Sequence, residues 1–169
     1  MRHALLTLLG MAALCRGSAV SGAQQIRADT LATCRVDRVV DGDTFFCASG
    51  EKVRLIGIDT PELDQGSIGR RAREALISLI PIGSEVGLEI DVQRTDRYQR
   101  VLAYIWTGSV MVNEAMVSQG WAILYTVPPN VRYVERFQIA QDSAKAAGAG
   151  FWKDDDFACP PERHRKREC

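Results

Sequence analysis

The sequence lacks an excess of charge of either sign. Its 169 residues contain 21 Lys and Arg and 21 Asp and Glu, which gives a formal net charge of zero. Residues 1–23 hold two of the basic residues and none of the acidic ones, so the chain without them carries a net charge of −2. Proteins that bind nucleic acid are commonly basic overall, which counts against tight, non-specific binding to DNA. Any affinity for phosphate must therefore come from a local site.

The sequence also lacks the residue pattern of a structural zinc site. It contains only two histidines, His3 and His164, and none of its five cysteines belongs to a Cys-x-x-Cys pair. Zinc sites draw on such closely spaced ligands, so zinc binding is disfavoured. No internal repeat, long linker or low-complexity segment is visible. A chain of this length has room for one domain with a hydrophobic core.

No apolar run in the sequence is long enough to cross a bilayer. The run Ala4–Cys15 instead follows a short polar start and precedes the small residues Ser21–Ala23. This arrangement predicts a secretory signal peptide over residues 1–23 that is cleaved near Ala23. The alternative is a buried N-terminal helix. We expect a secreted or periplasmic protein that has no stable membrane association after cleavage.

Four cysteines remain after this cleavage, and an even count in an exported protein indicates disulfide bonds. Four cysteines allow three connectivities. Cys34 and Cys47 flank a tight turn and should face each other across two strands, whereas Cys159 and Cys169 lie in a polar C-terminal tail, residues 153–169. We therefore expect two local pairs, Cys34–Cys47 and Cys159–Cys169, the second of which closes the tail.

Hydrophobic periodicity predicts five strands and three helices. The strands have β-branched or alternating residues, and Asp41-Gly42 between the first two is a strong hairpin signal. The helices have a period near 3.6, end at Gly or Pro, and the last has Asn130 as a candidate N-cap. Such an order predicts an α+β, mainly β fold built on a small Greek-key barrel. The predicted strands are Arg35–Val40, Thr44–Cys47, Val53–Ile58, Val86–Val92 and Val101–Trp106; the predicted helices are Gly66–Ile80, Val110–Gln119 and Asn130–Ala147.

Acidic and basic side chains recur where these strands end. Two carboxylates occupy the first hairpin turn, two more follow the third strand, one arginine interrupts that strand, and another stands beside the fifth. Carboxylates suit a hard cation and arginines suit phosphate, so the set indicates metal-assisted phosphodiester chemistry. Alternatively, the Asp-Gly-Asp sequence is only a hairpin turn and the strand arginine forms a structural ion pair. These residues are Asp41, Asp43, Arg54, Asp59, Glu62 and Arg100.

Four motifs in fixed order resemble the staphylococcal nuclease (thermonuclease) family. They are Val40–Thr44, Arg54–Glu62, Gln93–Tyr104 and Met111–Gly120. The resemblance runs from about residue 35 to residue 152, nearly the whole of the predicted mature domain, residues 24–152. It implies a five-stranded OB-fold Greek-key barrel with three α-helices and a nuclease activity that depends on Ca²⁺.

The resemblance also implies roles for the acidic residues. Asp43 and Asp59 would hold the calcium ion together with the backbone carbonyl of Thr60. So few protein ligands imply weak binding, with a dissociation constant on the order of 10⁻⁴–10⁻³ M. Glu62, three residues after Asp59, would act as the general base toward water.

The basic and aromatic residues would bind the substrate. Arg54 and Arg100 would clamp the phosphate through their planar guanidinium groups. Arg97 and Tyr98 lie where the family contacts further substrate phosphate, and Tyr125 is the candidate ring for base stacking. The implied substrate is DNA or RNA, with single-stranded or unpaired regions preferred, and the protein is expected to be a monomer.

Two loops beside the expected site depart from the family pattern. Gln99 replaces a frequent glycine in the loop before the fifth strand, which leaves the shape of that loop open. The loop after Glu62 is also shorter than in the best-known member of the family. Because this loop flanks the expected site, it bears on substrate preference.

Two other classes of function compete with an enzyme. The first is a catalytically weak or inactive OB-fold module that binds nucleic acid or a peptide. The second is a disulfide-stapled envelope protein with a vestigial site. Every ligand and catalytic residue that the family pattern requires is present here, and this retention favours the nuclease.

Overall fold

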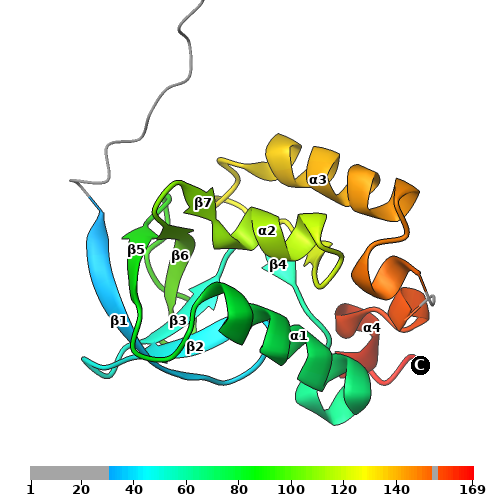
Figure 1. Ribbon diagram of the computed structural model, residues 1–169, viewed down its shortest axis with the longest axis horizontal. Helices are drawn as coiled ribbons and strands as arrows, with labels where there is room; N and C mark the ends of the chain where they lie inside the picture. Colours follow the sequence, from blue (N-terminus) through cyan, green and yellow to red (C-terminus); the bar gives the residue numbers. More distant parts are fainter. Residues whose placement is uncertain (1–30, 154–155) are drawn as a thin grey trace, which may run out of the picture.

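The computed structural model describes residues 31–153 and 156–169, so the predicted signal peptide, residues 1–23, lies outside the described residues. Its centre is a closed barrel of five strands in the order β3-β2-β1-β5-β6 (Figure 1). Parallel pairing of β3 with β6 closes the barrel, which confirms the predicted mainly β, OB-type fold. The strands are β1 (Ala32–Val39), β2 (Thr44–Cys47), β3 (Lys52–Leu55), β5 (Glu85–Glu89) and β6 (Val101–Thr107).

The hairpin of β1 and β2 brings the first acidic turn to one end of the barrel. Val39 pairs with Phe45, and the Val40 amide donates to the Thr44 carbonyl at 2.8 Å. Both strands contribute buried side chains to the core, and Phe45 is fully buried. The predicted Cys34–Cys47 disulfide joins the other end of the same hairpin, with the Cα atoms 5.6 Å apart.

Three short strands lie outside the five-strand barrel. β7 (Val110–Met111) extends the sheet beyond β6, while β4 (Ile58–Asp59) pairs with β8 (Ile123–Leu124). In this second pair Asp59 stands opposite Ile123. The β4–β8 pair therefore fixes the backbone that carries Asp59 beside the barrel.

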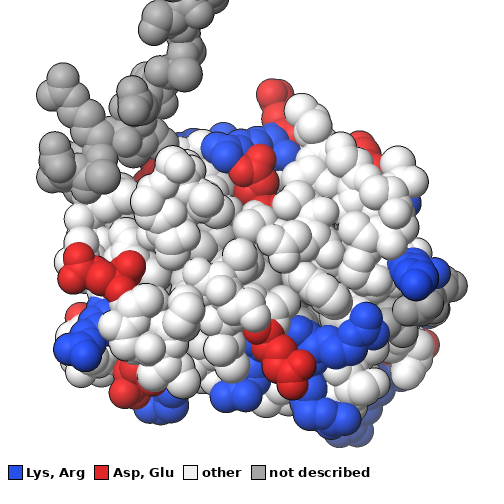
Figure 2. All heavy atoms as spheres, viewed as in Figure 1, with Lys and Arg blue, Asp and Glu red and all other residues white. Residues whose placement is uncertain are grey.

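Three helices cover one side of the barrel: α1 (Ser67–Leu79), α2 (Val112–Ser118) and α3 (Val134–Ala146) (Figure 1). α1 buries Leu76 and exposes Arg70 and Glu74, and Figure 2 shows basic side chains around an acidic patch in the region of α1. The ring of Phe137 in α3 packs on Gly57, where an added Cβ would lie 2.6 Å from the ring. The helices thus support the turn between β3 and β4.

Several predicted boundaries are wrong. Val92 was expected inside a strand, but β5 ends at Glu89 and Val92 is 72% exposed. The second helix begins at Val112 because the preceding two residues form β7. Asn130 caps no helix: α3 begins at Val134, and the buried Asn130 amide instead bonds both backbone polar groups of Gln93 at 2.7 and 2.9 Å.

The C-terminal segment folds back onto the domain. It contains the short helix α4 (Pro161–Arg165), and the predicted Cys159–Cys169 disulfide closes a ring around it. Phe157 is buried and packs edge-on against Phe151 at a centroid distance of 5.2 Å. The sequence predicted a polar, disulfide-closed tail. The structure adds that this tail contains a fourth helix and is anchored by the buried Phe157. Over residues 31–153 and 156–169, no helix combines the length and apolar character needed to cross a membrane.

Candidate active site

The Asp-Gly-Asp turn is held by its own side chain and by close packing. The Asp41 carboxylate accepts a hydrogen bond from the Asp43 amide at 3.1 Å, a local bond that is typical of Asp in turns. A Cβ on Gly42 would lie 2.7 Å from the Thr60 hydroxyl and 2.8 Å from Ala72. Glycine is therefore required for the turn to approach Thr60 this closely.

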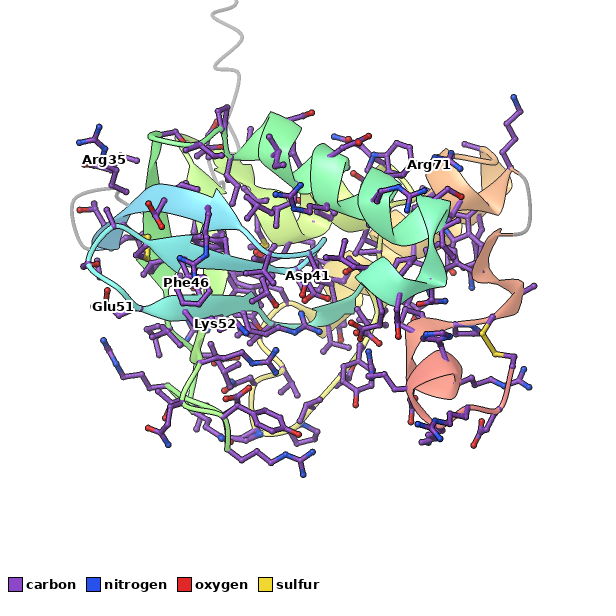
Figure 3. The ribbon with its side chains drawn as sticks, turned by 90° about the horizontal axis from the view of Figure 1, so that it is seen from below. Arg35, Asp41, Phe46, Glu51, Lys52 and Arg71 are labelled. Atoms are coloured by element: carbon purple, nitrogen blue, oxygen red, sulfur yellow. A yellow bond between two sulfur atoms is a disulfide. The ribbon has the colours of Figure 1, made fainter. Side chains whose placement is uncertain are left out.

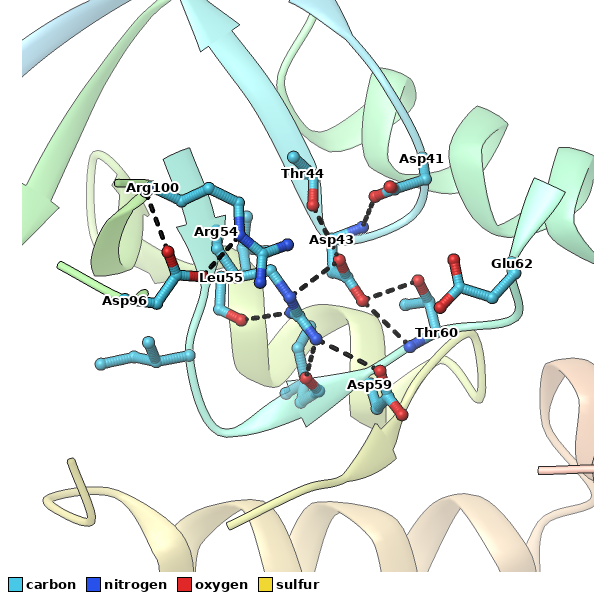
Figure 4. Close-up of polar contacts among 12 residues, drawn as sticks. Asp41, Asp43, Thr44, Arg54, Leu55, Asp59, Thr60, Glu62, Asp96 and Arg100 are labelled. Carbon is cyan, nitrogen blue, oxygen red and sulfur yellow. Dashed lines mark hydrogen bonds and ion pairs between the residues drawn. The ribbon is translucent and has the colours of Figure 1, made fainter. Parts of the chain in front are cut away.

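Thr60 holds the Asp43 carboxylate in place. Its amide and its hydroxyl donate to one Asp43 oxygen at 3.1 and 2.9 Å, and the Thr44 hydroxyl donates to the other at 3.0 Å (Figure 4). Both Asp43 and Thr60 are buried. This contact of the Thr60 side chain was not apparent from the sequence, which assigned to Thr60 only a carbonyl ligand.

Arg54 joins the two carboxylates that were predicted as calcium ligands. Its Nε lies 3.1 Å from Asp43 and its Nη2 lies 3.2 Å from Asp59. The guanidinium also donates to the carbonyls of Leu55 and Ile58 at 2.6 and 3.0 Å. These four contacts fix the orientation of the guanidinium. Arg54 therefore forms the structural ion pairs that were the alternative to phosphate binding, and it also faces the predicted site (Figure 4).

The buried acidic groups make an environment that disfavours negative charge. Burial raises the pKa of Asp41 to about 7, and the nearby charge of Asp43 adds to the shift. Burial also raises the pKa of Asp59, although hydrogen bonds from Arg165 and the charge of Arg54 oppose it. A cation placed among these carboxylates would therefore stabilise their ionised forms.

Arg165 lies in the candidate site, and the sequence interpretation missed it. From α4 its Nη1 and Nη2 bind the two oxygens of Asp59 at 3.1 and 2.8 Å, and Nη1 also binds Glu62 at 2.7 Å. In Figure 3 Asp41 lies between the barrel strands and the C-terminal helix, beside which the yellow disulfide bond is drawn. The available signal was the basic run Arg163–Arg167 inside a disulfide ring. Sequence distance hid its target, which lies about a hundred residues upstream.

Arg100 lies on the other side of Arg54, in a loop stabilised by Asp96. The Asp96 carboxylate accepts from the Arg100 amide at 3.0 Å and from its Nε at 2.6 Å. Arg97 donates to the Tyr98 hydroxyl at 2.7 Å, and Tyr98 is 64% exposed. Gln99 takes the place of the frequent glycine by adopting a positive φ of 61°, so the loop keeps the left-handed turn that glycine normally provides.

A cleft of about 590 Å³ connects these groups. The acidic residues and Arg54 line one part of it, while the loop of Arg100 and the half-buried Tyr125 line another. Thr60 is the one predicted ligand or catalytic residue that does not line the cleft. The predicted residues that do line it are Asp43, Arg54, Asp59, Glu62, Arg97, Tyr98, Arg100 and Tyr125, joined by Asp41, Asp96 and Arg165.

The donors present suit a hard cation. Asp43 and Asp59 offer carboxylate oxygens, and both of these groups pair with Arg54. Asp59 also binds a second positive group of the chain, the Arg165 guanidinium. In the described part of the chain, no three His, Cys, Asp or Glu side chains are grouped so that they could hold a metal ion. An ion here would depend on few protein ligands, and oxygen donors of this kind fit Ca²⁺ better than a softer metal.

Comparison with known proteins agrees with this geometry. Residues 52–154 match the family described as Staphylococcal nuclease homologue. A thermonuclease of Staphylococcus hyicus is 35% identical over 130 residues, which cover 72% of this chain and 76% of that protein. A thermonuclease of Staphylococcus intermedius is 34% identical over 126 residues (70% and 74%), and an uncharacterized endonuclease of Haemophilus influenzae is 33% identical over 140 residues (80% and 74%). With the barrel and the acid–arginine cleft, these matches show that the chain belongs to the staphylococcal nuclease family.

Proposed function

We propose that this nuclease hydrolyses phosphodiester bonds of DNA or RNA with the help of calcium, by attack of water on phosphorus. The observation that carries the proposal is the pairing of Arg54 with both Asp43 and Asp59 inside a cleft that also contains Glu62 and Arg100. Acidic groups for a cation and arginines for a phosphate thus lie in one cavity, as metal-assisted phosphodiester hydrolysis requires.

Calcium would be held by Asp43, Asp59 and the carbonyl of Thr60, with water or substrate phosphate completing the coordination. When bound, calcium would neutralise charge on the phosphate and help to orient a water molecule. We expect a dissociation constant on the order of 10⁻⁴–10⁻³ M, because so few of the six to eight oxygen ligands come from the protein.

Glu62 would accept the proton of the attacking water. Its side chain is 34% exposed and lines the cleft, so water can reach it. In the structure this carboxylate accepts a hydrogen bond from the Arg165 guanidinium. Glu62 can therefore act as a base only when one of its oxygens faces water rather than that guanidinium.

Arg54 and Arg100 would stabilise the charge that develops on phosphorus. Arg54 is fixed by two backbone carbonyls, and Arg100 by Asp96, so neither must reorganise far to meet a phosphate. Preorganised donors of this kind lower the barrier more than flexible ones. Because Arg54 and Arg100 already bind carboxylates, a phosphate has to compete for the same N–H groups.

The outer part of the cleft would select the substrate. Arg97 and Tyr98 belong to an exposed loop, and Tyr125 lines the same cleft. An exposed arginine and two rings suit an unpaired strand, whose bases are free to stack. We propose a preference for single-stranded or unpaired nucleic acid and a monomeric enzyme.

Export is part of the same proposal. Disulfides persist in oxidising compartments, and both Cys34–Cys47 and Cys159–Cys169 are formed in the structure. A secreted or periplasmic location, reached by cleavage near residue 23, would account for them. Mass spectrometry of the exported protein should find that new N-terminus and four fewer hydrogens than the thiol form.

The test is cleavage of a short single-stranded oligonucleotide with calcium and with a chelator. Asp59→Asn should reduce the rate by at least about 100-fold, because a bound ion supplies several kcal/mol of charge stabilisation. Asp37→Asn is the matched control, since the exposed Asp37 pairs with its neighbour Arg38 and does not line the cleft. Full cleavage in chelator would contradict the calcium requirement, and binding without cleavage would favour the non-catalytic binding module.

A further inference from the structure

The acidic site carries more negative groups than the barrel can neutralise. Asp41, Asp43 and Asp59 are all at least half-buried, and Glu62 joins them at the cleft. Arg54 is paired with Asp43 and Asp59. Buried carboxylates at close range repel each other unless a further cation or a proton is present. The site therefore favours an additional cation.

In the structure that additional cation is Arg165. It binds both oxygens of Asp59, in the side-by-side geometry that makes guanidinium–carboxylate pairs strong, and it also binds Glu62. These are the carboxylates to which calcium binding and general-base chemistry were assigned above. One guanidinium thus binds both the carboxylate assigned to calcium and the carboxylate assigned to the general base.

The C-terminal ring keeps this guanidinium close to the site. The buried Phe157 anchors the segment, the Gln65 side chain donates to the Cys159 carbonyl at 3.1 Å, and His164 lies 3.0 Å from Asp64. A tethered group has a high effective concentration and competes well with a free ion. The Arg165 side chain itself is 39% exposed, so it can leave the carboxylates while the anchor stays buried.

We propose that Arg165 is a built-in competitor for calcium. Calcium binds Asp59 only when the Arg165 guanidinium leaves it, and the strength of the Arg165 contact sets the calcium concentration that the enzyme requires. The same displacement frees Glu62 for water. This inference rests on the calcium site proposed above. α4 lies beyond residue 154, where the family match ends, so Arg165 lies outside the segment that the family model covers.

The experiment is calorimetric titration of calcium into the whole mature protein without substrate. Arg165→Ala should lower the dissociation constant for calcium by about 5- to 30-fold, because a competing contact worth one to two kcal/mol would be absent. Thermal unfolding in chelator should show that the variant is folded, and calcium should raise its melting temperature more than that of the wild type.

Two variants separate competition from a general effect of charge. Arg163→Ala removes the same charge from the same helix, but the Arg163 side chain pairs with Glu168 and does not line the cleft. The calcium affinity of this variant should therefore stay that of the wild type. Arg165→Lys keeps the charge and loses the paired geometry. It should bind calcium more tightly than the wild type and less tightly than Arg165→Ala.

The outcomes distinguish this inference from the proposed function. If Asp59→Asn loses calcium binding while Arg165→Ala binds as the wild type does, the calcium site stands and the competition is refuted. Equal tightening by Arg163→Ala would likewise refute it, because net charge alone would explain the gain. If Asp59→Asn binds calcium normally, both the calcium site and the competition are wrong.

Discussion

Two clusters in this protein pair buried carboxylates with arginine, one around Glu89 and one around Asp59. Glu89 accepts hydrogen bonds from Trp106 Nε1 at 2.8 Å, from Arg132 at 2.6 Å and from the Tyr133 hydroxyl at 2.9 Å. Burial raises the pKa of Tyr133 to about 12, and the hydrogen bond to Glu89 adds to this shift, so the phenol remains a donor. The Glu89 cluster is satisfied by its own neighbours.

The cluster around Asp59 differs in what surrounds the carboxylate. Its neighbours include two more acids, Asp43 and Glu62, and its donors are the two arginines Arg54 and Arg165. It opens on the cleft, which Glu89 does not line. A buried acid bound by neutral donors and one arginine stabilises the fold, whereas acids gathered on one side of a cleft need a cation that can be exchanged.

The largest expected effect comes from replacing Glu62. Glu62→Gln should lower the single-turnover cleavage rate by roughly 10²–10⁴-fold, the usual scale of general-base catalysis, with little change in substrate affinity. Glu89→Gln is the matched control, because it makes the same change in the cluster that does not face the cleft. Cleavage that survives Glu62→Gln would show that the comparison between the two clusters is wrong.

Arg100→Lys should have the next largest effect. Loss of a donor to the developing charge costs roughly 10²–10³-fold in rate, and a lysine cannot reproduce the planar fork. Arg97→Lys, at an exposed position of the same loop, should keep most of the activity because this side chain serves mainly as a charge. Equal losses in the two variants, measured in single-turnover reactions, would count against a special role for Arg100.

The Glu89 cluster should respond in stability rather than in rate. Glu89→Gln removes a charged acceptor that holds three donors, which should lower the free energy of unfolding by roughly 1–3 kcal/mol. Glu114→Gln is the control, since Glu114 pairs with Arg136 at a more exposed position, where such pairs contribute no more than about 1 kcal/mol. Urea unfolding measures both. A larger loss in Glu114→Gln would contradict the structural role of Glu89.

The smallest effect is expected at Gln99, in the loop that carries Arg100. Gln99 has a φ of 61°, and glycine relieves a left-handed strain of about 1 kcal/mol while adding freedom to the unfolded chain. Gln99→Gly should therefore change the free energy of unfolding by less than about 1 kcal/mol, in the stabilising direction. Gln119→Gly, at a helical φ of −85°, should be destabilising. If both variants change the free energy of unfolding in the same direction, Gln99 is not under backbone strain.

The barrel was predictable because local signals and long-range pairing agree. The hairpin signal at Asp41-Gly42 and the short apolar run Val101–Trp106 each indicate strands, and the structure contains them. Predictions were wrong where a tertiary contact outweighed a local preference. Asn130 has the chemistry of an N-cap, yet it bonds the backbone of Gln93, because a buried polar side chain binds whichever backbone groups it meets.

Motif spacing by itself determined that Asp43, Asp59 and Glu62 belong to the candidate site, because the strand ends that carry them meet at one end of the barrel. Only the tertiary structure decided what those carboxylates bind. The sequence allowed either an acidic partner or an anionic ligand for Arg54, and the fold directs its guanidinium to Asp43 and Asp59. Arg165 meets Asp59 through a contact across more than a hundred residues, and no local pattern encodes such a pairing, since it depends on how the C-terminal ring docks.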